Sequence, residues 1–401
     1  MKLVAIFISA FITFCAFSQK TSQLNNQIWR GELSMNDRLE IPFLFTLEKK
    51  SKKYRMTILN GEERISMNIS QKKDSITAFF PGIDAYLKFK IEGKELRGYW
   101  LNQNKKKLQK IPLHGSNEQK ARFEWKNIVH PQQIKNKYSI EFSDDADKSI
   151  SVGIFTSNKD IIQGTIMTET GDYRFLDGNI NGNSFKMSTF NGTWAMLVEG
   201  QILGDSVVGN FYSGSSYHTG WSGKADDNVM LRKASSLTYV VNDQTINFST
   251  VKALNGKPFR AKNNTTIKLY QIMGSWCPNC LDEMVFFKEL HKDFAKEGLE
   301  IIALAYENQQ DLSSALSKLK KFEKRMEIPY SIFYAGNASK EEASKTFPML
   351  NQIMSFPTSI LVDRNGKIRH IHTGFSGPAT GKVYEDYKEE MRGIIKSLLA
   401  E

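Results

Sequence analysis

The distribution of apolar and polar residues divides this chain into two halves. From about residue 28 to 232, segments such as "IPFLFTLEKK", "YRMTILNGEE" and "IIQGTIMTETGDYRFLDG" alternate apolar with polar positions, and the last two contain Asn-Gly, Thr-Gly or Asp-Gly pairs. Period-two alternation with glycine turns predicts antiparallel hairpins. No segment here keeps a helical period for three turns, and 116–128 is the one ambiguous piece. The first half is therefore expected to be all-β.

The all-β half contains an internal repeat. Similar residues recur at an offset of 110, and "IEGKELRGYW" (91–100) then matches "ILGDSVVGNF" (202–211) at an offset of 111. Glycines recur because tight turns need positive φ. We interpret the pattern as a tandem duplication of a β-meander that forms two small sheets or one shared sandwich or barrel, with chance similarity of hairpins as the alternative. The matched positions are Phe45-Thr46 with Phe155-Thr156, Gly61 with Gly171, Arg64 with Arg174, Phe80 with Phe190, Gly82 with Gly192, and Ala85 with Ala195.

Beyond residue 240, helical and strand patterns follow one another. The segment 278–298 has apolar residues at helical spacing and ends at Gly298, and 299–307 is a nearly continuous apolar run, as buried parallel strands are. This order predicts an α/β sandwich around a mixed sheet. The other expected elements are strands at 266–273 and 330–335, helices at 311–326, 339–347 and 383–401, and a hairpin at 358–374.

Length and charge add two constraints. A chain of 401 residues exceeds the usual size of one domain, and its 40% hydrophobic and 24% charged residues are ordinary for a globular protein. The formal net charge of +11 raises the question of an anionic partner. However, the lysines gather at 49–53, 72–73 and 105–107, where turns between strands are expected. We interpret them as solvated hairpin tips and expect no nucleic-acid partner.

The first 18 residues have the pattern of a secretory signal peptide. Lys2 precedes an apolar run from Leu3 to Phe17, and small residues favour cleavage before Gln19. The run is too short and wrongly flanked for a membrane-spanning helix, and no other stretch is long and apolar enough, so the mature chain is expected to have none. A lipid anchor on Cys15 is disfavoured because the preceding residue is a bulky phenylalanine. The protein is therefore expected to be exported to the periplasm or cell envelope.

Cleavage before residue 19 leaves two cysteines, Cys277 and Cys280, both in "GSWCPNC". Zinc would need two more ligands, and there is no second Cys-x-x-Cys, while His291 is three helical turns away. A static disulfide across two residues would constrain little chain. A redox pair therefore remains the best interpretation, and we expect no metal and no cofactor apart from a redox-active Cys277–Cys280 disulfide.

The surroundings of the motif resemble a known family. A strand ends in Trp-Cys-x-x-Cys at the start of a helix, and 77 residues after Cys280 the sequence "SFPTSILVD" enters a hairpin. Residues 240–401 thereby resemble the thioredoxin fold, and in particular the TlpA-like branch of extracytoplasmic thiol–disulfide oxidoreductases. The resemblance does not extend to the β half of the chain. Two departures, the inner Pro-Asn pair and Phe356 before the proline, put the reduction potential and the choice of partner in doubt.

General chemistry supports a reactive thiol at this place. The nucleophile is a thiolate, and unpaired N–H groups together with the dipole at a helix start favour negative charge on the sulfur of Cys277. Pro278 lacks an N–H and sets φ for the first helical turn. Cys280 lies one turn further on and can resolve a mixed disulfide.

The resemblance also implies roles for individual residues. In the resembled family the first cysteine is exposed and attacks, the second is buried, and a glutamate at the position of Glu283 tunes the protonation of the pair. The alternative for Glu283 is an exposed helix carboxylate that balances the charge of Lys288. Pro357 is expected to be cis, with a trans loop proline as the alternative. The expected catalytic residues are Cys277, Cys280 and Glu283, and the expected substrate-binding residues are Trp276, Pro278, Phe356, Pro357 and Thr358.

Two classes of function follow. The first is a secreted thiol–disulfide oxidoreductase, in particular a reductase of protein disulfides, with a substrate protein and an upstream thiol electron donor, for which a membrane-bound protein is one option. The second is a binding protein whose β half carries the function, with aromatic residues such as Trp194, Tyr212, Tyr217 and Trp221 as candidates for a ligand cleft. A peroxidase would need a threonine three residues before its nucleophilic cysteine. Position 274, three before Cys277, is glycine, so a peroxidase is disfavoured. The expected units are a signal peptide (1–18), β repeats at 19–130 and 131–235, and a thioredoxin-like domain at 240–401.

Overall fold

A computed structural model gives the fold of most of the chain. The expected signal peptide and Cys15 lie outside the described residues. Within those residues no helix has the length and apolar character needed to cross a membrane. The structure describes residues 28–50, 53–103, 108–119, 121–146, 149–260, 266–309 and 311–401.

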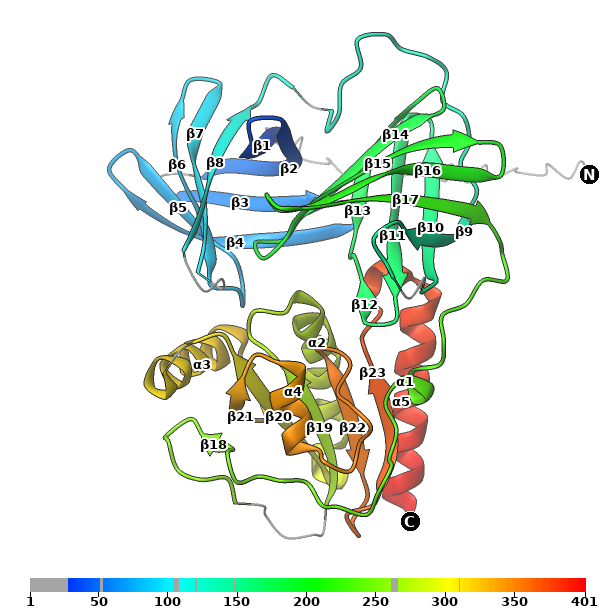
Figure 1. Cartoon of the computed structure of the whole chain (residues 1–401). Helices are drawn as coiled ribbons and strands as arrows, with labels where there is room; N and C mark the ends of the chain where they lie inside the picture. The colour runs from blue at the N-terminus through cyan, green and yellow to red at the C-terminus, as the bar shows by residue number, and fades with distance from the viewer. Residues whose placement is uncertain are drawn as a thin grey trace, which may run out of the picture.

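The first eight strands form a closed antiparallel barrel, because β1 pairs with β8 as well as with β2 (Figure 1). Alternate residues of β1 are buried, so that Trp29 and Leu33 belong to the barrel core, as period-two patterning requires. The strands are β1 (Ile28–Asn36), β2 (Leu39–Lys50), β3 (Lys53–Asn60), β4 (Glu63–Lys72), β5 (Ser75–Phe79), β6 (Ala85–Glu92), β7 (Glu95–Asn102) and β8 (Gln109–Ser116).

The next nine strands form a second sheet that also closes. Its order is β10-β9-β17-β16-β15-β14-β13-β11-β12, and the additional pairing of β10 with β11 joins the ring, leaving β12 beside β11. The strands are β9 (Lys137–Phe142), β10 (Ser151–Asn158), β11 (Ile161–Thr168), β12 (Gly171–Asp172), β13 (Leu176–Asn181), β14 (Ser184–Phe190), β15 (Ala195–Leu203), β16 (Ser206–Ser213) and β17 (Tyr217–Ala225).

The two barrels correspond strand by strand, apart from the two-residue strand β12 of the second. β6 begins at Ala85 and β15 at Ala195, which is the offset of 110 seen in the sequence. Gly82 and Gly192, paired by the same offset, both have positive φ, of 70° and 91°. A Cβ on Gly192 would lie 2.5 Å from Cγ of Phe80, so this glycine also permits close packing between the barrels. The all-β half is therefore one barrel for each copy of the repeat.

Aromatic and buried polar contacts join the barrels. The Phe190 ring of the second barrel lies 4.8 Å from Phe43 and 5.1 Å from Trp100 of the first, measured between ring centroids. Arg122, in the connection after β8, donates to the Leu59 carbonyl oxygen at 2.6 Å and to a carboxylate oxygen of Asp177 at 2.9 Å. The described residues of the ambiguous segment 116–128 thus form no helix, and they include an arginine that ties the barrels together.

The C-terminal domain contains a six-stranded mixed sheet of order β18-β21-β20-β19-β22-β23, with β19, β20 and β21 parallel. Every residue of β19 is buried because helices and loops cover both faces. Its strands are β18 (Lys252–Ala253), β19 (Ile267–Met273), β20 (Leu299–Glu307), β21 (Ser331–Asn337), β22 (Thr358–Val362) and β23 (Ile368–Thr373). Its helices are α1 (Ala234–Leu237), α2 (Pro278–Phe294), η1 (Ala295–Glu297), α3 (Leu312–Met326), α4 (Lys340–Thr346), η2 (Pro378–Thr380) and α5 (Lys382–Ala400).

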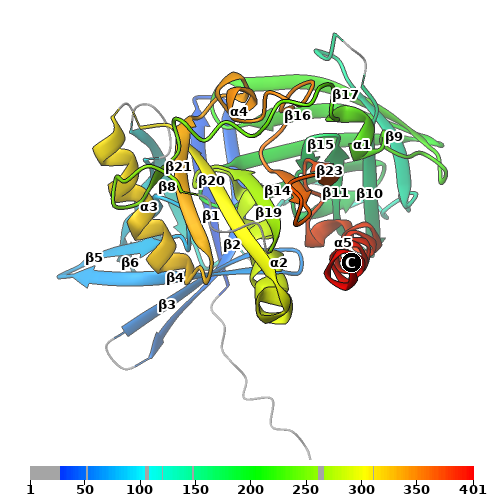
Figure 2. The same ribbon diagram turned by 90° about the horizontal axis from the view of Figure 1, so that it is seen from below.

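Two helices of this domain begin at side-chain caps. The side chain of Asp311 accepts from the Ser314 N–H at the start of α3, and Ser339 accepts from the Glu342 N–H at the start of α4. Figure 1 shows the C-terminal domain against one end of both barrels, and Figure 2 shows α3 on the side of the first barrel and α5 on that of the second. The fold class expected from the sequence, an all-β half followed by a thioredoxin-like α/β domain, is confirmed.

Candidate active site

The cysteine pair lies where β19 passes into α2. Cys277 is the N-cap residue and Pro278 opens the first turn of α2. Cys277 and Cys280 form a disulfide with their Cα atoms 5.3 Å apart. The Cys280 N–H also points at the Cys277 sulfur, at 3.2 Å. The sulfur of Cys277 therefore lies at the positive end of the helix, where a thiolate is favoured.

The loop before β22 faces this disulfide. The Phe356–Pro357 peptide bond is cis, as expected. The carbonyl oxygen of Phe356 lies 3.5 Å from the Cys277 sulfur. The Phe356 ring packs edge-on against Trp276, at 5.6 Å between centroids, and the Trp276 indole donates to the Tyr306 carbonyl oxygen at 2.9 Å. Two segments far apart in the sequence thus form one side of the site.

A buried carboxylate that was not predicted from the sequence fixes the loop between β19 and α2. Glu307, the last residue of β20, accepts from both the N–H and the hydroxyl of Ser275 at 2.8 Å. Lys318 of α3 lies 3.1 Å from the same carboxylate. This arrangement holds the residues just before Cys277 in place. Acidic residues at strand ends are common, so the sequence offered no distinct signal for it.

Cys277 is not exposed, contrary to the expectation for an attacking cysteine. Its relative exposure is 3%, against 0% for Cys280. The physical reason is the β half, because the turn at 168–174 of the second barrel lies over the start of α2. The Ser355 hydroxyl donates to the Thr170 carbonyl oxygen at 2.9 Å, and the Asn279 side-chain amide donates to that of Asp172 at 3.1 Å.

The contact between this turn and α2 is close. A Cβ on Gly171 would lie 2.3 Å from the Asn279 amide nitrogen, so only glycine fits without a shift. The carboxylate of Asp172 accepts from the Gly377 N–H at 2.9 Å, which adds a second attachment. Asn279, the unusual residue of the motif, therefore contacts the barrel rather than the solvent.

Arg174 joins the three parts of the molecule. Its guanidinium forms ion pairs with Glu63 of the first barrel and Asp282 of α2, and it donates to the Pro278 carbonyl oxygen at 3.3 Å. Burial raises the pKa of Asp282 to about 7, an effect that Arg174 opposes and the nearby Glu63 carboxylate increases. The sequence aligned Arg174 with Arg64 in the repeat, but nothing in that match indicated a partner in the other domain.

Glu283 lies one turn beyond Cys280 on α2 and is fully buried, so the alternative of an exposed carboxylate is wrong. It accepts from the Gln271 amide at 2.9 Å and from the Tyr387 hydroxyl at 3.4 Å. Gln271 also donates to the Cys280 carbonyl oxygen at 3.2 Å. Burial raises the pKa of Glu283 to about 8, although these hydrogen bonds lower it in part. Glu283 can therefore hold or release a proton near neutral pH beside the buried cysteine.

The disulfide lies at the edge of a cavity of about 460 Å³ between the two halves. Of the residues expected to bind substrate, Trp276 and Phe356 line this cavity and Pro278, Pro357 and Thr358 do not. Thr358 is buried and donates to the Ser355 carbonyl oxygen at 2.8 Å, so it supports the loop from inside. The other lining residues are Thr168, Thr170, Gly171, Asp172, Tyr173, Trp194, Met196, Phe211, Ser213, Tyr217, Cys277, Asn279, Lys340, Met354 and Ser355.

Two of the four aromatic candidates from the β half, Trp194 and Tyr217, line the cavity beside Cys277. Trp221 is buried in the core of the second barrel, and Tyr212 faces a different cavity between the barrels. Within the described ranges, no group of three or more histidine, cysteine, aspartate and glutamate residues is arranged to hold a metal ion.

Comparison with known proteins agrees with this geometry. Residues 241–387 match the Redoxin family. The thiol–disulfide oxidoreductase ResA of Geobacillus thermodenitrificans is 27% identical over 121 residues, covering 30% of this chain and 59% of that protein. The thiol:disulfide interchange protein DsbE of Vibrio cholerae is 28% identical over 137 residues, covering 33% and 60%. The chain thus spans somewhat more than half the length of these two relatives.

Solved structures also align with part of the chain. A thiol:disulfide interchange protein of Chlorobium tepidum aligns at 21% identity over 39% of this chain and 99% of that one, with a TM-score of 0.28. A disulfide isomerase of Bacteroides thetaiotaomicron, described as putative, aligns at 20% identity over 40% and 89%, with a TM-score of 0.26. The family match and the observed sheet together define the class: a Redoxin domain of thioredoxin-like fold that follows an all-β half. Its curated relatives are thiol–disulfide oxidoreductases.

Proposed function

We propose that this protein is an exported thiol–disulfide oxidoreductase that reduces protein disulfides through Cys277 and Cys280. The observation that carries the proposal is the disulfide at the start of α2, with the Phe356 carbonyl oxygen 3.5 Å from the Cys277 sulfur. Thiolate stabilisation by the helix end and a facing loop for substrate backbone are what such chemistry requires.

The reaction proceeds in two exchange steps. In the reduced protein, the Cys277 thiolate attacks one sulfur of a substrate disulfide; the new sulfur–sulfur bond forms as the substrate bond breaks, and the second substrate sulfur leaves as a thiolate and takes up a proton. The Cys280 thiolate then attacks the Cys277 sulfur, which reforms the internal disulfide and releases the first substrate sulfur. Two electrons pass to the substrate, and a dithiol donor protein returns the pair to the reduced state.

With a pKa of about 8, Glu283 can exchange a proton with its surroundings in the second step, when Cys280 reacts. Cys280 is fully buried and must lose its proton before it attacks. Glu283 lies on the same face of α2 one turn later, and Gln271 bridges its carboxylate to the Cys280 carbonyl group. We propose that Trp276 and Phe356 contact the substrate. The surfaces around it are shaped by Pro278, Pro357 and Thr358.

The proposal extends to location and partners. The protein acts in the periplasm or cell envelope after cleavage at residue 18, with a substrate protein and an upstream thiol donor, and it needs no cofactor besides its disulfide. Its units are the β repeats at 19–130 and 131–235 and the thioredoxin-like domain at 240–401. The +11 charge serves solubility rather than nucleic-acid binding.

An insulin-reduction assay with dithiothreitol as the electron source tests the activity. The wild type should accelerate precipitation of the insulin B chain, and Cys277→Ser should not exceed the uncatalysed rate. Equal acceleration by both proteins would refute the proposal.

The second candidate function is ligand binding by the β half, favoured by a cavity of about 900 Å³ between the barrels. In that case the biological role of the protein would survive Cys277→Ser. Complementation of a deletion strain by this variant therefore separates the two functions.

A further inference from the structure

The second barrel opens toward the disulfide. Phe211 and Met196 belong to the core of this barrel, and Tyr173 and Trp194 pack against that core. The same four side chains line the cavity that contains Cys277. The cavity is therefore the mouth of the barrel, with the disulfide and the Phe356 loop opposite it.

The mouth is chemically suited to apolar groups. Its aromatic and methionine side chains come from both domains, and Trp276 and Phe356 complete the ring on the opposite side. Lys340 is the one cationic side chain among the lining residues, and the acidic Asp172 already accepts from two backbone N–H groups, those of Gly377 and Arg174. A small thiol with two carboxylates, such as glutathione, would find few partners here.

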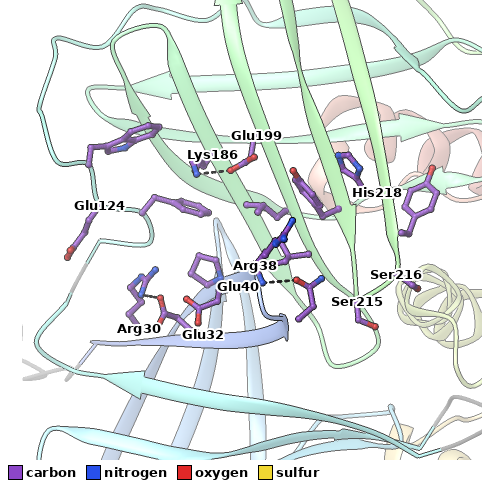
Figure 3. Close-up of a pocket in the computed structure, with 18 of the residues that line it drawn as sticks. Arg30, Glu32, Arg38, Glu40, Glu124, Lys186, Glu199, Ser215, Ser216 and His218 are labelled. Atoms are coloured by element: carbon purple, nitrogen blue, oxygen red, sulfur yellow. Dashed lines mark hydrogen bonds and ion pairs between the residues drawn. The ribbon is translucent and has the colours of Figure 1, made fainter.

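A second cavity shares one lining residue with this mouth. Tyr217, at the start of β17, lines both the mouth and the cavity of about 900 Å³ between the barrels. That outer cavity is polar. Figure 3 shows the ion pair of Arg30 with Glu32 and that of Lys186 with Glu199 around it. The hydroxyl groups of Ser215 and Ser216 and the indole of Trp125 lie among its lining residues.

We propose that the substrate is an extended polypeptide segment that occupies both cavities. Its cysteine reaches Cys277, an adjoining aromatic or aliphatic side chain enters the barrel mouth, and its polar continuation passes Tyr217 into the cleft between the barrels. This inference rests on the proposed function and names the substrate class. The two barrels thereby act as the specificity element of the oxidoreductase.

Two observations and the geometry of an extended chain favour an extended segment over the surface of a folded protein. The relative exposure of Cys277 is 3%, so a flat surface does not reach its sulfur past the turn at 168–174. An extended chain advances about 3.3 Å per residue and can follow a cleft of this kind. The outer lining carries both charges in pairs, which suits peptide groups and mixed polar side chains better than a strongly charged polymer.

The test compares disulfide substrates of increasing length. The probes are hydroxyethyl disulfide, a tripeptide disulfide with phenylalanine beside cysteine, its glycine counterpart, and the phenylalanine peptide extended by eight polar residues. We expect kcat/KM to rise about tenfold from the glycine to the phenylalanine peptide, and again with the extension, since tenfold corresponds to a well-packed side chain.

The variants Tyr217→Ala and Tyr99→Ala form a matched pair. Both tyrosines lie on barrel strands with similar exposure, 43% and 42%, but Tyr99 lines neither cavity. Tyr217→Ala should raise KM for the extended peptide about tenfold more than for hydroxyethyl disulfide. Tyr217→Phe, which keeps the ring, should restore most of the loss, and Tyr99→Ala should match the wild type.

A second pair tests the outer cleft alone. Arg38→Glu changes an exposed residue that lines the outer cavity, and Arg55→Glu makes the same change on an exposed residue outside both cavities. Only Arg38→Glu should alter KM, and only for the extended peptide.

The results separate this inference from the proposed function. Equal kcat/KM for all peptides, or equal losses on long and short substrates in Tyr217→Ala, would overturn the inference while the oxidoreductase activity stands. Failure of the wild type to reduce any of the disulfides would overturn both.

Discussion

The side-chain amide of Asn279 donates a hydrogen bond to the carbonyl oxygen of Asp172, at 3.1 Å, across 107 residues of sequence. One partner is an inner residue of the Cys-x-x-Cys motif and the other belongs to the short strand β12 of the second barrel. Because of this bond, the barrel forms part of the immediate environment of the cysteine pair. The predictions below concern that environment.

Replacing Asn279 with aspartate should make the cysteine pair more reducing. A carboxylate in the first turn of α2 would repel the Cys277 thiolate and raise the pKa of that thiol by about one unit. Because the reduced form is then less favoured, the reduction potential becomes more negative. Equilibration with glutathione measures the potential. Asn279→Ala, which removes the hydrogen bond without adding charge, is the control, and equal potentials in both variants would contradict the charge argument.

Replacing Arg174 with methionine should loosen the contact between the barrels and α2. The change leaves the carboxylates of Glu63 and Asp282 without their buried cation, and breaking such a pair costs about 3–5 kcal/mol. Hydrogen exchange at 168–174 and at the start of α2 should accelerate. The control is Arg64→Met, because Arg64 occupies the equivalent position of the first repeat but is exposed. The same exchange pattern in both variants would show that Arg174 has no special role.

Replacing Glu283 with glutamine should change how stability depends on pH. Burial raises the pKa of Glu283 from 4.5 to about 8, so its contribution to stability is complete below pH 4.5 and is lost as pH rises through 8. Glutamine resembles the protonated form and does not ionise. The stability of the oxidised variant relative to wild type should therefore improve by a few kcal/mol between pH 5 and pH 9, at about 1.4 kcal/mol per pKa unit. Urea unfolding at each pH measures the difference.

The control for this experiment is Glu297→Gln, which makes the same change at an exposed glutamate. Its replacement should leave the pH dependence of unfolding as in the wild type. If Glu283→Gln and Glu297→Gln give the same curves, Glu283 is not protonated at neutral pH.

Replacing Cys280 with serine should trap the mixed disulfide. Cys277 can still attack a substrate disulfide, but no second thiol is present to release the product. Mass spectrometry after incubation with insulin should show a covalent adduct that dithiothreitol removes. Cys277→Ser should give none, and an adduct on Cys280 in that protein would reverse the assigned roles.

The sequence by itself determined most secondary-structure elements and singled out the cysteine pair. Pro278 after Cys277 indicated the helix start, and the turn glycines at an offset of 110 revealed the duplicated β unit. These signals act through backbone geometry within a few residues, so they can be recognised without knowledge of the fold. They also led to the correct fold class for both halves.

Only the tertiary structure decided the environment of that motif. The burial of Cys277, the ion pairs of Arg174 and the raised pKa of Glu283 depend on contacts between distant segments, such as the 108 residues that separate Arg174 from Asp282. Dielectric surroundings and the pairing of charges are set by which surfaces meet, and a local sequence pattern carries no information about that. The sequence therefore identified the cysteine pair, whereas the packing of the second barrel against α2 determined what can reach it.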